Sequence, residues 1–499
     1  MRINSIKRIL IGSSACMISG AMSGLWTGAS LAQAEIEDVP CAMEETPENV
    51  TCGVLRVFEN WRGQNGDKID IFFIRRKADE PDPQAAPIFH LEGGPGAAAS
   101  VNAAGKLQGY AAEARRRDII LVDQRGTGRS SPLDCVTYDL TASPEQFQLL
   151  FRTGMFEPEV FRECRRRLAE HADLTQYTTT AIAHDINALR EALGYGMMSL
   201  NGGSYGTRLA LEIIRRHGAF VQSAVLLGVA PPTDFLVDRV ASDVETMLAK
   251  LFASCEADAA CSSQYPTFRD DFYEVLGALR GGGVETEFTN PGAGEPETVP
   301  LSYGHVATAL RYALYSTQLS AQLPLQIAQA KAGDYSALAA LQPNLLVALP
   351  NLVAEGMWAS VKCSEEVQFS DRAVATRNAR GSVMGLIRYN DEIAICADWP
   401  AGEIPSDFHD PVRSEVPVLL IAGELDVASP PDLARKTLAG LENGHLVILS
   451  NRSHWGLSGE PCPDQIVEAF LRNPADPSLE TGCAAELERP PFAMPEDAG

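Results

Sequence analysis

One serine stands in a setting that favours covalent chemistry. Ser204 is the centre of the string G-G-S-Y-G at 202–206, which follows an apolar run at 198–200 and precedes an apolar-periodic segment at 207–217. A strand, a tight turn and a helix are therefore expected, and in such a turn the residues two positions from the serine must be small. The helix N-terminus then brings a backbone N–H and partial positive charge to the reacting oxygen. This context predicts that Ser204 is a nucleophile, although a bare glycine-rich turn with an incidental serine is the alternative.

An acid and a histidine follow the serine along the chain. Asp426 ends the string G-E-L-D at 423–426, directly after an apolar run that is expected to form a strand. His454 lies in a loop after the next such run, so both residues are expected at one edge of a sheet. The order Ser…Asp…His is the one that α/β-hydrolases use, which predicts a triad of Ser204, Asp426 and His454. Three other histidines lie on or next to regular elements and are expected to be structural: His90, His184 and His217.

A second glycine-rich loop lies upstream of the serine. The string L-E-G-G-P-G at 91–96 directly follows an apolar run at 87–91. In an α/β-hydrolase the loop after that strand supplies one backbone N–H of the oxyanion hole. Glycine at this place lets the backbone approach a tetrahedral intermediate without a clash from Cβ. A plain tight turn is the alternative.

Strands and helices alternate in two regions of the chain. This alternation predicts an α/β fold, with a mostly parallel sheet and helices on both faces, of the α/β-hydrolase type. Strands are expected at 69–74, 87–91, 118–122, 198–200, 224–227, 416–422 and 445–449, and helices between them at 180–193, 207–217 and 432–441.

The long middle of the chain has a different pattern. It is mainly helical, with alanine- and leucine-rich stretches at 306–315 and 336–349, and it is interrupted by turn chemistry at 281–283 and 290–296. We predict a helical cap inserted between two strands of the core. The predicted organisation is a signal peptide at 1–34, hydrolase core at 35–230 and 412–475, the cap at 231–411 and a C-terminal extension at 476–499.

The amino terminus and the cysteines indicate export. A basic start is followed by an uncharged apolar stretch at 9–31 and then by A-Q-A at 32–34, a pattern typical of a cleaved signal peptide, with an uncleaved membrane anchor as the alternative. Eleven cysteines are present, ten of them after that segment, which fits an oxidising compartment. The simplest pairing joins neighbours in sequence: Cys41 with Cys52, Cys135 with Cys164, Cys255 with Cys261, Cys363 with Cys396, and Cys462 with Cys483.

Charge and histidine spacing bear on ligands and partners. The formal net charge of −24 argues against binding to nucleic acid or to an anionic membrane, so no membrane association is expected after signal cleavage. No C-x-x-C string occurs, and no histidine stands at zinc-ligand spacing beside a cysteine. We therefore expect neither a metal nor an organic cofactor, and a periplasmic or secreted protein.

Three strings together resemble a known family. G-G-P-G at 93–96, D-Q-R-G-T-G-R-S at 123–130 and G-G-S-Y-G-T at 202–207 are similar to those of the prolyl aminopeptidase and tripeptidyl aminopeptidase group of α/β-hydrolases. The resemblance covers the hydrolase core, at about 40–230 and 412–475, and the D-Q-R-G string is its most distinctive part. One difference is Glu92, which stands where many relatives have histidine before G-G-P-G. Asp123 and Arg125 of the D-Q-R-G string are expected to brace loops.

The resemblance also assigns roles to individual residues. The oxyanion donors would be the backbone N–H groups of Gly94 and Tyr205. Members of the group use glutamates of the cap to bind the ammonium of a peptide N-terminus, and the best matches here are Glu365 and Glu366 in C-S-E-E at 363–366. The alternative is that both are solvated surface acids, because charged residues are mostly exposed.

The function predicted from these residues is that of a serine hydrolase acting through an acyl-enzyme. The substrate is expected to be a peptide or a small ester. The resemblance favours an aminopeptidase that releases residues from free peptide N-termini. A carboxylic-ester hydrolase is the alternative enzyme, because the same triad cleaves esters, and a non-catalytic binding protein on the same scaffold is the alternative outside enzymes.

Overall fold

A large twisted sheet positions the predicted site. The computed structural model describes residues 36–41, 43–63, 66–135, 157–289, 296–348, 353–476 and 478–495, so the predicted signal peptide lies outside the described residues. Nine of the described strands pair in the order β1-β2-β3-β5-β4-β6-β7-β10-β11. Their bounds are β1 Ile36–Asp38, β2 Val50–Phe58, β3 Lys68–Arg76, β4 Ile88–Leu91, β5 Ile119–Val122, β6 Met198–Gly203, β7 Val221–Leu227, β10 Val418–Gly423 and β11 Gly444–Leu449.

The sheet is antiparallel at one end and parallel elsewhere. Strands β1, β2, β3 and β5 pair antiparallel in that order, and all pairs from β5 through β4, β6, β7 and β10 to β11 are parallel. The interior strands β5 and β10 are buried at every position, as expected where helices cover both faces. The predicted α/β fold with a mostly parallel sheet is confirmed. Sequence analysis missed β1 and β2 at the antiparallel end.

Helices cover the sheet on its two faces and form two separate cores. On one face α3 (Pro158–Leu168), α4 (Thr179–Ala192) and α5 (Tyr205–His217) pack against the strands. On the other face α1 (Ala103–Gly109) and α17 (Pro461–Arg472) do so. Helix α16 (Pro431–Leu438) lies between β10 and β11 in the chain. Because the connections between parallel strands run through these helices, the carboxyl ends of β6, β10 and β11 meet at one edge of the sheet.

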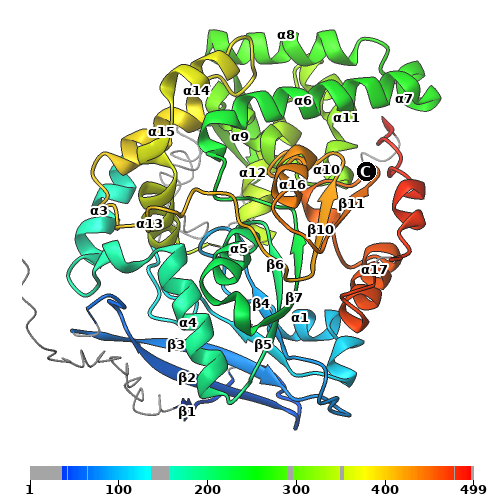
Figure 1. The fold of residues 1–499 in the computed structure, drawn as a ribbon. Helices are drawn as coiled ribbons and strands as arrows, with labels where there is room; N and C mark the ends of the chain where they lie inside the picture. The colour runs from blue at the N-terminus through cyan, green and yellow to red at the C-terminus, as the bar shows by residue number, and fades with distance from the viewer. Residues whose placement is uncertain are drawn as a thin grey trace, which may run out of the picture. The chain divides into compact units, whose positions relative to one another are not determined.

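The segment between β7 and β10 forms an additional layer with its own apolar core. Its helices α6, α8, α9 and α11 bury Val244, Phe272, Leu310 and Ile327 among one another, and Figure 1 shows α6 and α8 in green at the top of the view, above the strands. The helices are α6 Leu236–Ala257, α7 Ala259–Gln264, α8 Phe268–Gly281, α9 Tyr303–Ala313, α10 Thr317–Ser320, α11 Leu323–Lys331, α12 Ser336–Ala348, α13 Glu355–Glu365, α14 Arg372–Asn378 and α15 Ile387–Cys396.

This layer also contains a β-hairpin that sequence analysis missed. Strands β8 (Glu285–Thr289) and β9 (Pro296–Pro300) pair antiparallel. Each strand buries one apolar side chain, Phe288 and Val299 respectively, while most of its neighbours are exposed. Because two polar, glutamate-containing segments of five residues contain no apolar run, their sequences show only the turn between them.

Five disulfides join the cysteines that are neighbours in sequence, which are the pairs predicted above: Cys41–Cys52, Cys135–Cys164, Cys255–Cys261, Cys363–Cys396 and Cys462–Cys483. The fourth bridge ties α13 to the end of α15. The fifth holds the C-terminal extension against α17. Within the described ranges, none of the helices combines the length and the apolar character needed to cross a membrane.

Candidate active site

Ser204 lies at a sharp turn between β6 and α5. Its backbone has φ 54° and ψ −121°, a strained conformation for a residue with a side chain. A Cβ added at Gly202 would lie 2.4 Å from the carbonyl oxygen of Gly206, and one added at Gly206 would lie 2.1 Å from the carbonyl oxygen of Leu91. Both glycines are therefore required by the turn. The G-x-S-x-G spacing thus reflects steric crowding around the turn at Ser204, as the sequence predicted.

Asp426 and His454 form a hydrogen-bonded pair at the carboxyl edge of the sheet. His454 Nδ1 lies 2.8 Å from Asp426 Oδ2, and Asp426 is fully buried. The other carboxylate oxygen accepts hydrogen bonds from the backbone N–H groups of Ala428 and Ser429, both at 2.8 Å. Burial by itself would raise the pKa of Asp426, but the adjacent imidazole and the bonds from Ser429 outweigh it and hold the pKa below its usual value. The carboxylate is therefore ionised and fixed toward the imidazole.

Sequence analysis missed Ser429, which belongs to this hydrogen-bond system. Its hydroxyl donates to Asp426 Oδ2 at 2.8 Å and lies 3.2 Å from His454 Nδ1. A serine three residues after an aspartate is a common local hydrogen-bonding arrangement, and the D-x-x-S spacing was the available signal. Ser429 therefore helps to hold the carboxylate in the plane that the imidazole requires.

Gly228 links the serine to the histidine. It follows β7, whose last residue, Leu227, accepts the backbone N–H of Ser204 at 2.8 Å. A Cβ at Gly228 would lie 3.1 Å from His454 Cε1 and 3.0 Å from Ser429 Oγ. The imidazole therefore rests against the backbone directly beside the nucleophile strand. The structure thus places the three predicted residues after the carboxyl ends of β6, β10 and β11, with β7 between β6 and β10.

The glycine-rich loop after β4 lies against the nucleophile. A Cβ at Gly93 would be 3.2 Å from the Cβ of Ser204, and Gly94 has φ +105°, a conformation that favours glycine. Among the described residues no acceptor is recorded for the N–H of Gly94 or of Tyr205. Both N–H groups are thus available to an oxyanion beside Ser204.

The side chains of the D-Q-R-G string at 123–126 support this loop and the backbone around it. Gln124 donates through Nε2 to the carbonyl oxygen of Glu92 at 2.9 Å, and Asp123 accepts the backbone N–H of Ser100 at 2.8 Å. Arg125 forms a fully buried ion pair with Asp185 at 2.7 Å. Each side chain is hydrogen-bonded to backbone or to a buried partner, so the string has the geometry of a structural support.

Glu92 forms a compact charged cluster beside the loop. One carboxylate oxygen lies 2.7 Å from Lys106 Nζ and 3.0 Å from His90 Nε2, and His90 Nδ1 lies 2.7 Å from the hydroxyl of Tyr110. Burial would raise the pKa of Glu92, but His90 and Lys106 together lower it to about 2. Glu92 is therefore ionised, and its charge is balanced by its own neighbours.

The two cap glutamates are buried, which excludes the expectation of solvated surface acids. Glu365 is fully buried, and its oxygens accept the backbone N–H of Thr179 at 2.6 Å and the Thr179 hydroxyl at 2.8 Å. Glu366 pairs with Arg208 at 2.7 Å and with Lys362. The Thr179 hydroxyl also lies 2.7 Å from the hydroxyl of Tyr205. Both carboxylates thus have protein partners next to the nucleophile helix, and binding of a substrate ammonium by them stays a prediction.

The two glutamates differ in protonation. Burial raises the pKa of Glu365 to about 7, against the opposing effects of Arg208 and of the hydrogen bonds from Thr179. Burial would also raise the pKa of Glu366, but Lys362 and Arg208 lower it to about 2. Glu365 therefore titrates near neutral pH, with both its protonated and its ionised form populated, while Glu366 stays ionised.

This difference predicts a pH dependence of stability. The pKa of Glu365 is higher in the folded state than the ordinary value of 4.5, so the folded state binds more protons between pH 4.5 and 7. Its contribution to the free energy of unfolding is therefore lost as pH rises through that window. Between pH 5 and 8 the free energy of unfolding of the unmodified protein should fall by roughly 2 kcal/mol more than that of Glu365→Gln.

Urea unfolding at four pH values between 5 and 8 measures this difference. Glu415→Gln is the control, because Glu415 is an exposed glutamate and its replacement should leave the pH slope unchanged. Glu366→Gln is unsuitable, because the charge of Glu366 is one of the causes that raise the pKa of Glu365. Parallel slopes for Glu365→Gln and the unmodified protein would contradict the protonation assigned to Glu365.

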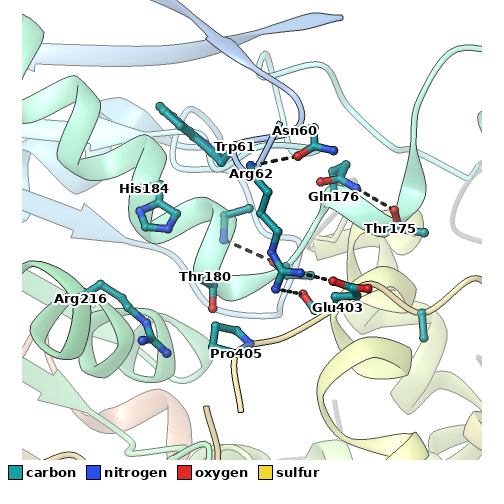
Figure 2. Close-up of a pocket in the computed structure, with 13 residues that line it drawn as sticks. Asn60, Trp61, Arg62, Thr175, Gln176, Thr180, His184, Arg216, Glu403 and Pro405 are labelled. Carbon is teal, nitrogen blue, oxygen red and sulfur yellow. Dashed lines mark hydrogen bonds and ion pairs between the residues drawn. The ribbon is translucent and has the colours of Figure 1, made fainter. Parts of the chain in front are cut away.

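One cavity in the described part of the chain lies away from the triad. It has a volume of about 720 Å³ and is lined by the β2–β3 loop, the start of α4 and residues 401–405. Figure 2 shows the Arg62 side chain reaching Glu403 across it, with His184 and Arg216 on the other side. His184 Nδ1 lies 3.1 Å from His217 Nε2, and Arg216 pairs with Asp407. These polar groups are paired with protein atoms, and the residues of the predicted triad are not among those that line the cavity.

Comparison with known proteins agrees with this geometry. Residues 86–273 match the family model described as the alpha/beta hydrolase fold, and residues 382–483 match the model described as TAP-like protein. The first range contains Ser204 and the glycine-rich loop, and the second contains Asp426 and His454.

Three curated relatives are similar to the chain. Serine protease Hip1 of Mycobacterium tuberculosis (strain CDC 1551 / Oshkosh) is 23% identical over 489 residues, which cover 90% of this chain and 91% of that protein. Tripeptidyl aminopeptidase of Streptomyces lividans is 22% identical over 494 residues, which cover 91% of this chain and 88% of that protein. Proline iminopeptidase of Neisseria gonorrhoeae is 28% identical over 148 residues, which cover 30% of this chain and 34% of that protein.

The fold and the two family matches define the class: the chain is an α/β hydrolase. Within this class its C-terminal part is of the TAP-like kind, and the chain is a serine hydrolase of the peptidase type.

Proposed function

We propose that the protein is an exported aminopeptidase that releases residues from free peptide N-termini through a Ser204–His454–Asp426 triad. The observation that carries this proposal is the strained turn at Ser204 beside a buried Asp426–His454 pair with a 2.8 Å hydrogen bond. Relatives named tripeptidyl aminopeptidase and proline iminopeptidase support the choice of substrate. The five disulfides support export, which N-terminal sequencing of the purified protein would test by finding Glu35 first.

The proposed mechanism follows from the positions of the groups. Ser204 Oγ attacks the scissile carbonyl while its proton passes to His454 Nε2, because Nδ1 is held by Asp426. The N–H groups of Gly94 and Tyr205 bind the oxygen as it becomes negative. The imidazolium then protonates the leaving amine, the C–N bond breaks, and an ester to Ser204 remains. Water repeats the same steps to release the acyl group.

A matched pair of substrates tests the requirement for a free amino terminus. Acetylation removes the ammonium charge and adds bulk, so an aminoacyl-arylamide with a free amine should be cleaved with a kcat/KM at least about 100-fold higher than its N-acetylated form. The measurement is release of the arylamine under initial-rate conditions. Simple p-nitrophenyl esters serve as the comparison, since an ester hydrolase cleaves them without regard to an amine. Equal cleavage of the free and acetylated arylamides would contradict the aminopeptidase proposal and favour the esterase.

The same substrates test the proposed binding role of the cap glutamates. If Glu365 or Glu366 binds the ammonium, its replacement by glutamine raises KM for the free amine and spares the residual cleavage of the acetylated substrate. If the pair only supports the nucleophile helix through Thr179 and Arg208, both substrates lose activity to the same degree. The two results therefore distinguish substrate binding from structural support.

A further inference from the structure

An exposed tryptophan stands directly beside the proposed general base. Trp455 follows His454 in the short helix η5 (His454–Gly456), and 43% of its surface is exposed. Its backbone N–H donates to the carbonyl oxygen of Tyr315 at 2.9 Å, and the two rings lie 5.4 Å apart. A single exposed apolar side chain is ordinary in a folded protein. Trp455 differs from such a residue because it lies next to His454 in the chain.

Tyr315 connects the tryptophan to the imidazole. Its ring centre lies 5.0 Å from that of His454, in an edge-to-face arrangement with an interplanar angle of 76°. The Arg311 guanidinium lies 5.0 Å from the centre of the same ring and so holds it from the cap side. Within the described ranges no hydrogen-bond partner is recorded for the Tyr315 hydroxyl. The three rings therefore form a continuous aromatic surface, made of His454, Tyr315 and Trp455, which we call the aromatic ledge. Its polar group is the Tyr315 hydroxyl, and its exposed ring is that of Trp455.

The chemistry fixes which part of a substrate meets this ledge. In acyl transfer the acyl part becomes bonded to Ser204, and the leaving nitrogen must come within hydrogen-bond reach of His454 Nε2. Asp426 occupies the Nδ1 edge of the imidazole. The atoms carried by the leaving nitrogen therefore extend away from that edge, past Gly228 and Tyr315, which lie against the imidazole. Trp455 is next on this side, in ring contact with Tyr315.

We propose that the aromatic ledge, with Trp455 as its exposed ring, is the subsite for the residue that leaves with the new amino terminus, and that it selects an apolar or aromatic side chain at that position. This inference rests on the proposed function, since it assigns a specificity to the same reaction. Trp455 is a specificity-determining residue, because it contacts the leaving part of the substrate and takes no proton. Stacking of an aromatic leaving residue on the exposed ring adds to the burial of its apolar surface.

The test uses peptides that share the acyl part and differ only in the leaving residue, phenylalanine or alanine. The ratio of kcat/KM for the two peptides should fall by about tenfold in Trp455→Ala and be largely restored in Trp455→Phe. Phe220→Ala is the matched control, because Phe220 has 40% of its surface exposed but precedes β7, at the opposite end of the strand from the triad. An unchanged ratio in Trp455→Ala, or an equal loss for both peptides that Trp455→Phe does not reverse, would overturn the proposal.

A second measurement separates this proposal from the proposed function. The acyl-enzyme can be intercepted by an added amino acid amide, whose amine attacks the Ser204 ester, forms a C–N bond and releases the serine oxygen, which regains its proton through His454. Phenylalanine amide should compete with water better than alanine amide in the unmodified enzyme, and this advantage should vanish in Trp455→Ala.

Because acylation by an activated ester suffices to form that intermediate, the interception experiment remains valid if peptides are not cleaved. Failure to cleave any free-amine peptide would then refute the proposed function alone. Equal interception by the two amides in the unmodified enzyme would refute the aromatic subsite alone.

Discussion

Replacement of Ser204 by alanine is expected to lower kcat by about five to six powers of ten and to leave the fold intact. The change removes the one atom that bonds to the acyl group, and the remaining members of a triad cannot replace it. The turn itself is held by backbone contacts, including the bond from the Ser204 N–H to Leu227 and those from Thr207 to the Ser204 carbonyl oxygen. None of these contacts uses the hydroxyl. The oxyanion N–H groups are therefore expected to stay in place.

Two measurements check this result. The first is turnover of the free-amine arylamide, and the second is covalent labelling by a fluorophosphonate, which reports an activated serine without any assumption about the substrate. Ser263→Ala is the control, because Ser263 is an exposed serine of α7 in the cap. Labelling should persist in the control and be absent from Ser204→Ala. Retention of more than a small fraction of either signal in a correctly folded Ser204→Ala protein would show that another residue is the nucleophile.

Asp426→Asn is expected to lower kcat by about four powers of ten, the second largest effect. The amide keeps the size of the side chain but removes its charge, and Asp426 accepts bonds from two backbone N–H groups, from the Ser429 hydroxyl and from His454. An amide NH₂ directed at His454 Nδ1 would favour the tautomer that carries its proton on Nε2. That tautomer cannot accept the proton of Ser204. The loss should therefore appear in kcat far more than in KM.

Glu424 provides a control within the same turn. It lies two residues before Asp426 and accepts the backbone N–H of Asn451 at 3.2 Å, with no recorded contact to the imidazole in the described structure. Glu424→Gln should therefore change kcat by no more than a few-fold. A loss in Asp426→Asn as small as that in Glu424→Gln would mean that Asp426 does not orient the base, and Glu92 and Asp123 would then be the next acids to replace.

The features of the site that can be predicted most directly from sequence are those that depend on residues close together in the chain. The strained turn at Ser204 needs glycine at 202 because a Cβ there would collide with Gly206, only four residues away, and the strand before it and the helix after it follow from local apolar periodicity. The glycine at 206, in contrast, is required by a long-range contact with Leu91. The disulfides also join cysteines close in sequence, from 6 to 33 residues apart. The order of Ser204, Asp426 and His454 is likewise read along the chain, and the strands that precede them lead to one edge of the sheet.

Other features depend on residues that are far apart in sequence, and the folded chain alone determined them. Nothing in the string C-S-E-E shows that Glu365 is fully buried, because its burial depends on Thr179, which lies 186 residues earlier. The different protonation of Glu365 and Glu366 arises in the same way, from Arg208 and Lys362 packed unequally against two adjacent carboxylates.

Trp455 and Tyr315 illustrate the same limit at the proposed subsite. They are 140 residues apart, and the identity of each residue indicates only that it is aromatic. Their contact exists because the loop after α9 reaches the loop that carries His454, where Ser453 donates to the Leu314 carbonyl oxygen. Local sterics and periodicity therefore predict from sequence the candidates for the reaction. Long-range packing of the cap against the core decides how the cap glutamates are charged and brings together the residues of the proposed subsite.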